Sequence, residues 1–119
     1  VHPTAWVSST AALGPGAVVL AGAIVNAGAV VGPHAIVNTG AVVEHDAEIG
    51  AFAHVGPGAV VGGGAVLCAG AFAGMGSLVR DHVTVGVDAV LAMGAVVITD
   101  VPAGLTVLGL PARPAPSRR

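Results

Sequence analysis

The sequence has 119 residues, the length of one domain, and a formal net charge of −2. It contains no lysine and only four arginines, so the clustered positive charge that nucleic acid binding needs is missing. Gly, Pro and polar residues interrupt every stretch long enough to cross a membrane, so we expect neither nucleic acid nor a membrane as a partner. The single cysteine, Cys68, excludes an internal disulfide and favours a cytoplasmic location.

The chain repeats in units of six residues from Val1 to Pro102, giving seventeen hexads without a break in register. The first position is Val, Leu or Ile in every hexad but one, and the fifth is Ala in fourteen of them. Glycine recurs at the second and fourth positions. This regularity argues against a merely low-complexity Ala/Gly/Val segment.

A period of six fits neither an α-helix nor a long strand, but it fits a short strand followed by a bend. Val and Ile favour strands, whereas Gly, Pro, Asn and Asp favour bends. The sequence therefore predicts an all-β fold, a parallel β-helix of just under six coils over residues 1–102. Residues 103–119 lose the period and are predicted to form a short C-terminal extension.

One polar stretch, residues 43–55, stands out in this apolar chain. It holds three of the six acidic residues and two of the five histidines. His45, between acids, is the candidate general base, because an imidazole titrates near neutral pH. The structural alternative is that His45 is a solvated histidine in a turn.

The hexads resemble those of the hexapeptide-repeat acyltransferases, in which three hexads form one left-handed coil of 18 residues. Segments 2–5 (HPTA), 38–46 (NTGAVVEHD) and 100–104 (DVPAG) are similar to one branch of that family. This branch comprises the sialic-acid O-acetyltransferases and UDP-4-amino-sugar N-acetyltransferases. Its members usually carry an N-terminal sugar-binding domain, which we expect to be missing from this sequence.

The resemblance implies transfer of an acetyl group from acetyl-CoA to an amino or hydroxyl group of a nucleotide sugar, by direct attack in a ternary complex. The family's base maps onto His45 and its orienting carboxylate onto Asp46, where a Glu is more usual. Because Asp is shorter, Glu44 is an alternative partner. We expect no metal in this site.

The resemblance also implies where acetyl-CoA binds. The family's coenzyme A contacts map onto His54, Met75 and Met93, and the ending around Pro111 resembles the segment that lines the cofactor site. Gly63 is a candidate to offer its backbone N–H to the thioester oxygen. The structural alternatives are that the methionines fill gaps at the surface and that Gly63 is a plain bend glycine.

Residues 18 apart should stack in one column if each coil has 18 residues. Gly63 then lies one coil above His45, and Asp81 lies above Gly63. His54 is half a coil from His45, so the two histidines can share a site only if they come from different chains. This spacing predicts a cyclic oligomer, and the resemblance implies a homotrimer with active sites between subunits.

Two other functions fit a β-helix of this kind. A γ-class carbonic anhydrase holds zinc with three histidines, but its H-x4-H pair is missing here, leaving only His45, His54 and His82 as chance ligands. A non-catalytic scaffold or an ice-binding solenoid is the other alternative. The threonines form no ladder of the kind that ice binding needs, and a scaffold leaves the acidic cluster at 44–48 unexplained.

Overall fold

The computed structural model describes residues 1–116, within which eighteen short strands form three sheets and no helix occurs. Neighbouring strands within each sheet are parallel, except for the last pair. Sheet A contains β1 (Trp6–Val7), β4 (Ile24–Val25), β7 (Val42–Val43), β10 (Val60–Val61), β13 (Leu78–Val79) and β16 (Val96–Val97). Sheet B contains β2 (Ala12–Leu13), β5 (Val30–Val31), β8 (Glu48–Ile49), β11 (Val66–Leu67) and β14 (Thr84–Val85). Sheet C contains β3 (Val18–Val19), β6 (Ile36–Val37), β9 (His54–Val55), β12 (Phe72–Ala73), β15 (Val90–Leu91), β17 (Thr106–Leu108) and β18 (Arg113–Pro114).

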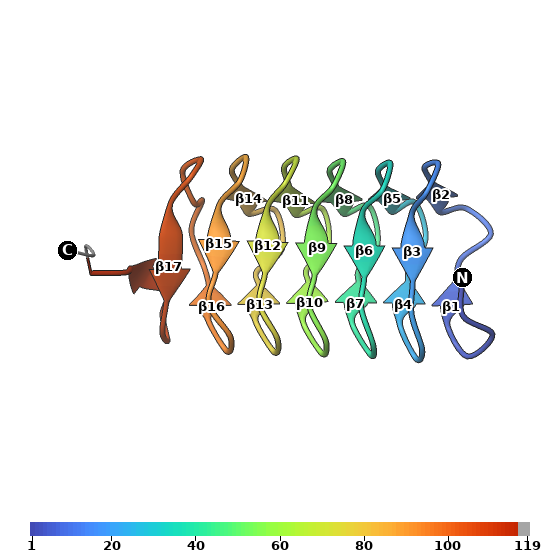
Figure 1. Cartoon of the computed structure of the whole chain (residues 1–119), viewed down its shortest axis with the longest axis horizontal. Coiled ribbons are helices and arrows are strands. Elements are labelled where there is room, and N and C mark those ends of the chain that lie inside the picture. Colours follow the sequence, from blue (N-terminus) through green and yellow to red (C-terminus); the bar gives the residue numbers. More distant parts are fainter. Residues whose placement is uncertain (117–119) are drawn as a thin grey trace.

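The chain visits the three sheets in turn, one strand per hexad, so that each circuit adds one coil (Figure 1). Val60 pairs with Leu78, 18 residues later, and the same spacing relates Trp6 to Ile24. The predicted coil of three hexads is therefore confirmed. The chain is an all-β solenoid of about 6 turns, consistent with a left-handed β-helix.

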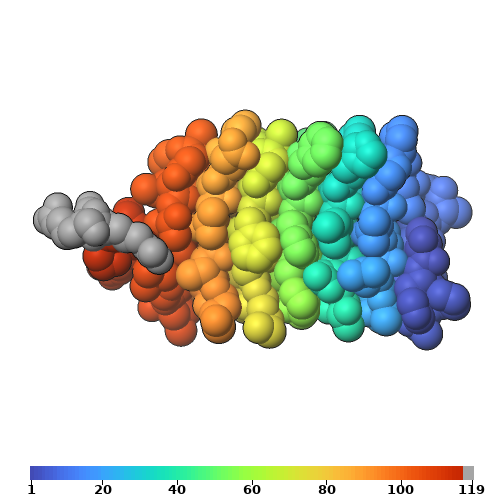
Figure 2. Space-filling model, viewed as in Figure 1, coloured from blue at the N-terminus to red at the C-terminus, as the bar shows by residue number. Residues whose placement is uncertain are grey.

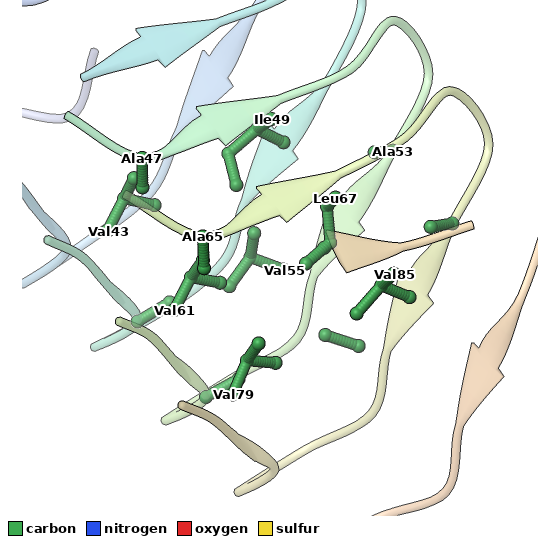
Figure 3. Packing of buried hydrophobic residues seen from close by; sticks show 14 of the residues in the cluster. Val43, Ala47, Ile49, Ala53, Val55, Val61, Ala65, Leu67, Val79 and Val85 are labelled. Atoms are coloured by element: carbon green, nitrogen blue, oxygen red, sulfur yellow. The ribbon is translucent and has the colours of Figure 1, made fainter. Parts of the chain in front are cut away.

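The core is built from the first and fifth residues of the hexads. First-position side chains such as Ile49, Leu67 and Val85 point into the prism (Figure 3) and are at most 1% exposed. From Ala23 onward the fifth-position alanines are buried beside them, and Val83 and Val101 take this position in two hexads. Each buried aliphatic side chain contributes about 1.5–3 kcal/mol. Ser77 replaces the alanine in one hexad, and its buried hydroxyl has no hydrogen-bond partner among the described residues.

The bends between strands require a left-handed backbone. Every fourth position from Gly16 to Gly94 has a φ between 57° and 73°. Most of these residues are glycine, which adopts this φ without strain, and Asp46 is one of the exceptions. Aspartate is among the few other residues that tolerate it. The sheets connect at three corners, called here AB, BC and CA after the sheets they join.

The C-terminal end breaks the 18-residue spacing. Val101 bridges to Val85 only 16 residues earlier, and β17 pairs with β15 at the same shortened spacing. The carboxylate of Asp100 accepts a hydrogen bond of 2.9 Å from the backbone N–H of Thr84. The β18 strand then runs antiparallel to β17. The predicted boundary at residue 102 falls inside this short coil, and part of the predicted extension, residues 117–119, lies outside the described residues.

The molecule is a rod with extents of 44 × 24 × 20 Å, and its successive coils form bands across it (Figure 2). Residues 1–116 include no helix long and apolar enough to cross a membrane.

Candidate active site

His45 lies in the AB corner, in the turn that joins β7 to β8. Three backbone hydrogen bonds fix the conformation of this turn. The N–H of Ala47 donates to the carbonyl of Glu44 at 3.2 Å, the N–H of Asp46 donates to a carbonyl in the coil below, and the carbonyl of His45 accepts from Gly64 in the coil above. The backbone of His45 is therefore held by the coils on both sides, while its side chain points outward and is 64% exposed.

Asp46 is the carboxylate that contacts His45. Its Oδ2 lies 3.3 Å from Nδ1 of the imidazole. An ionised carboxylate only accepts hydrogen bonds, so this contact favours the tautomer with the proton on Nδ1 and leaves Nε2 free as a base. Of the two predicted partners, Asp46 makes this contact, and within the described residues Glu44 makes none with His45.

His54 lies on sheet C, in β9, next to the CA corner. The side-chain amide of Asn38 lies 3.0 Å from its Nε2. The oxygen of that amide accepts a bond of 2.7 Å from the N–H of Thr39, so its nitrogen is the group that donates to His54. Nε2 is then the acceptor, and Nδ1 carries the proton.

Partial burial lowers the pKa of His54 below 6.5, because desolvation disfavours the imidazolium. The ring of Phe72, one coil above, meets the His54 ring edge to face with centroids 5.1 Å apart. Partial burial and the Phe72 ring therefore both favour the neutral form of the His54 imidazole.

Met75 and Met93 stack in the CA corner, where the N–H of Gly94 donates to the carbonyl of Met75. Their exposed fractions, 55% and 74%, are high for methionine. Beyond Met93 a hollow of about 420 Å³ borders the extension; its lining residues are Ala92, Leu105, Thr106, Leu108, Ala115 and Pro116. Pro111 lies exposed in the turn between β17 and β18 and lines neither this hollow nor the next one.

A second hollow, of about 280 Å³, lies at the C-terminal end of the prism near Asp100. Neither hollow is lined by His45 or His54. The two histidines belong to different parts of the perimeter, because β8 and the BC corner separate them along the chain. Within residues 1–116, the two hollows described above thus lie away from both histidines. Within residues 1–116 no group of three His, Cys, Asp or Glu side chains comes together that could hold a metal ion.

Stacking in the AB corner follows the predicted column. The bonds from Gly64 to the His45 carbonyl and from His82 to the Gly63 carbonyl place Gly63 above His45 and the next corner above that. Asn38 was not among the predicted site residues, and its side chain bonds to His54 of the next coil. Its spacing was a usable signal, because Asn38 stacks under Gly56, two residues beyond His54.

The sequence matches no protein-family model and no curated protein. Among solved structures it is similar to PerB from Caulobacter crescentus, in complex with CoA and GDP-perosamine. The two chains are 41% identical with a TM-score of 0.96, and the match covers 98% of this chain and 56% of PerB. The acetyltransferase domain of PglB from Neisseria gonorrhoeae, in complex with acetyl coenzyme A, matches with 43% identity and a TM-score of 0.95 over 96% of this chain and 56% of that one.

AntD, an N-acyltransferase from Bacillus cereus, shares the fold at 13% identity, with a TM-score of 0.92. This chain spans little more than half the length of PerB and of the PglB domain, at 56% of each. The repeat, the three stacked sheets and these similarities lead to one assignment: the chain belongs to the hexapeptide-repeat β-helix acyltransferases.

Proposed function

We propose that the chain transfers an acetyl group from acetyl-CoA to an amino or hydroxyl group of a nucleotide sugar, with His45 as the general base. One observation carries this proposal: the contact of 3.3 Å between His45 Nδ1 and Asp46, on an exposed corner of a fold shared with sugar N-acetyltransferases. PerB, which is 41% identical, was solved with CoA and GDP-perosamine, so a donor and an acceptor of these classes fit that relative.

In the proposed reaction, Asp46 holds the proton on Nδ1, and Nε2 of His45 removes the proton from the acceptor nitrogen or oxygen as that atom attacks the thioester carbonyl. The tetrahedral intermediate collapses, the carbon–sulfur bond breaks, and the proton on His45 passes to the departing thiolate. The carboxylate stabilises the imidazolium that forms between these two steps.

The donor groove would run along the CA corner. His54 presents its Nδ1–H at one end, and the exposed thioethers of Met75 and Met93 offer an apolar, adaptable surface to the pantetheine arm. The hollow beside Ala92 and the turn at Pro111 would continue this path. The N–H of Gly63 is proposed as a donor to the thioester oxygen.

A homotrimer would bring the two corners together. The outward-facing residues of sheet A are apolar in every coil, namely Trp6, Ile24, Val42, Val60, Leu78 and Val96, whereas the outward rows of sheets B and C include Glu48 and His54. An apolar face of this length suits an interface between copies of the chain. Sheet A lies between the AB and CA corners, so packing it around a threefold axis places His45 of one copy toward His54 of the next.

This proposal locates the reaction in the cytoplasm, where acetyl-CoA and nucleotide sugars are available, and it involves no nucleic acid or membrane partner. The single cysteine is free, as a reducing compartment would require.

The test is to mix the chain with acetyl-CoA and matched nucleotide sugars that carry either an amino group or a hydroxyl group at one position. Release of the CoA thiol and the mass of the acetylated sugar are measured. We expect His45→Ala to lower turnover at least about a hundredfold, while His34→Ala, at the exposed BC corner, leaves it unchanged.

Unchanged turnover in His45→Ala would reject the assigned base. Absence of any acetyl transfer would favour the scaffold, and zinc-dependent CO2 hydration would favour the carbonic anhydrase alternative.

A further inference from the structure

The AB corner directly above His45 holds three consecutive glycines, Gly62, Gly63 and Gly64. The structure explains the absence of a side chain differently at each of the three positions. A Cβ on Gly62 would lie 2.6 Å from the backbone nitrogen of Asp81 and 2.7 Å from the Val79 carbonyl oxygen. Gly62 is therefore required by the stacking of the coils. Gly64 has a left-handed φ of 67°, as the fourth position of the bend demands.

Gly63 satisfies neither of these requirements. Its φ lies outside the left-handed region, and the three atoms nearest to an added Cβ all belong to one side chain. They are Nε2, Cε1 and Cδ2 of His45, at 2.6, 2.7 and 3.3 Å. The closest obstacle to a side chain at 63 is therefore the His45 ring, and not the backbone of a neighbouring coil as it is at Gly62.

The rest of the repeat supports this interpretation. Gly63 occupies the third position of its hexad, and every other hexad from 1 to 102 carries a side chain there. Neighbouring corners hold Pro57, Ala69 and Met75 at that position. The fold thus accepts a side chain at the third position, and the one glycine stands directly above the proposed base.

The contact also involves the chemically relevant edge of the ring. Asp46 lies at Nδ1, so the free base is Nε2, and Nε2 is the atom closest to where a Cβ of residue 63 would be. The imidazole thus lies across the Gly63 backbone, and Gly63 is buried although it is at a corner.

We propose that Gly63 is a positioning residue for His45, whose missing side chain leaves the space that the Nε2 edge of the imidazole occupies while Nδ1 contacts Asp46. This inference rests on the proposed function of His45, and it assigns to Gly63 a role separate from the proposed donation by its N–H. The two roles differ in a testable way, because alanine at 63 keeps the N–H but adds the Cβ.

The experiment compares the unmodified chain with Gly63→Ala, His45→Ala and the double variant, each measured by ¹⁵N NMR of the imidazoles, thermal unfolding and steady-state kinetics. We expect Gly63→Ala to change the Nδ1 and Nε2 shifts of His45 toward those of a free, mixed-tautomer histidine. We expect kcat to fall about 10- to 100-fold with the KM for acetyl-CoA unchanged. Ala69→Ser, which enlarges a third position in the next corner, is the matched control and should change none of these.

The unfolding midpoint separates this role from a structural one. In the His45→Ala background, where the ring is gone, Gly63→Ala should leave the midpoint unchanged or raise it, because alanine restricts the unfolded chain. A lower midpoint in that background would overturn the proposal by showing that the fold needs this glycine. Unchanged His45 shifts would overturn it as well, whether kcat is retained or the KM for acetyl-CoA rises. If the chain transfers no acetyl group, the proposed function fails, while the NMR and unfolding results still decide the role of Gly63.

Discussion

The amide nitrogen of Asn38 lies 3.0 Å from Nε2 of His54, and the N–H of Thr39 fixes the orientation of that amide. This pairing decides which nitrogen of His54 carries the proton, because the Asn38 nitrogen can only donate. A histidine that would otherwise exchange between two tautomers is thereby held in one, with its remaining N–H directed away from Asn38.

The first prediction concerns this pair. Replacing Asn38 with Asp puts a carboxylate beside Nε2 and should raise the pKa of His54, since a negative charge favours the imidazolium. Asn38→Ala removes the donor without adding charge and should leave both tautomers populated. NMR titration of the His54 ring measures both effects, with His34 in the same spectra as the internal control.

The sign of the pH effect in the unmodified chain follows from burial. Because the pKa of His54 is below 6.5 in the folded chain, the unfolded chain binds more protons in the window between the folded pKa and 6.5. The contribution of His54 to stability is thus complete above pH 6.5 and is lost as the pH falls through the folded pKa. In Asn38→Asp the loss of stability at acid pH should become smaller or change sign. An unchanged dependence of the unfolding free energy on pH would contradict the contact assigned between residue 38 and His54.

The second prediction asks which carboxylate serves His45. Asp46→Asn keeps the size of the side chain but removes its charge, so we expect kcat for acetyl transfer to fall about 10- to 100-fold. Glu44→Gln makes the same chemical change on the other side of His45 and should alter kcat less than about twofold, since Glu44 makes no contact with the ring. A larger loss in Glu44→Gln than in Asp46→Asn would reverse the assignment.

The third prediction tests the apolar face of sheet A. Val60 and Val66 both point outward and are both partly exposed, but Val60 lies on sheet A and Val66 on sheet B. We expect Val60→Asp to convert a trimer into monomers, because a charge buried at an interface without a partner is costly. Val66→Asp should keep the mass of the unmodified chain in sedimentation analysis. Equal masses for Val60→Asp and the unmodified chain would exclude sheet A as the interface.

The fourth prediction concerns the end of the prism. Asp100→Ala removes the acceptor of an exposed hydrogen bond from the N–H of Thr84 and should cost about 0.5–1.5 kcal/mol of unfolding free energy. Asp100→Asn retains an acceptor oxygen and should recover most of that loss. Chemical denaturation of both variants and of the unmodified chain measures the difference, and a stability of Asp100→Ala equal to that of the unmodified chain would show that the side-chain contact contributes nothing.

The fifth prediction uses the unpartnered hydroxyl of Ser77. Ser77→Ala removes a buried polar group that makes no hydrogen bond, so the chain should become more stable by about 1 kcal/mol. Ala59 occupies the same place one coil below and is fully buried. The reverse change, Ala59→Ser, should therefore destabilise the chain by a similar amount. A loss of stability in Ser77→Ala would indicate a partner for its hydroxyl.

The repeat made the fold predictable, because a period of six with a fixed apolar first position leaves few ways to bury the same side chain in every coil. The column of His45 and Gly63 followed directly from the 18-residue coil. The choice between Glu44 and Asp46 did not, since both flank His45 and only the left-handed backbone at Asp46 places its carboxylate beside Nδ1.

Two other features were beyond the sequence interpretation for physical reasons. The contact of Asn38 with His54 joins a corner of one coil to a strand of the next. The two residues are 16 apart, so counting in steps of 18, which finds only residues stacked directly above one another, does not reveal it. The shortening of the last coil from 18 to 16 residues could not be seen in the sequence, because hexad 97–102 still has a valine at its first position. Only its bend differs, with Asp100 bonded to the backbone of Thr84.

That shortened last coil has a consequence for how the rod behaves in a crowded solution. A stack of parallel strands offers at its end an edge onto which a foreign strand can add. Here β18 pairs with β17 in the antiparallel direction at the edge of sheet C. At the neighbouring edge, that of sheet B, the carboxylate of Asp100 accepts a hydrogen bond from the N–H of Thr84. Within the described residues, the edges of sheets B and C at this end of the rod are thus partly occupied by the chain itself, which disfavours the addition of a foreign strand there.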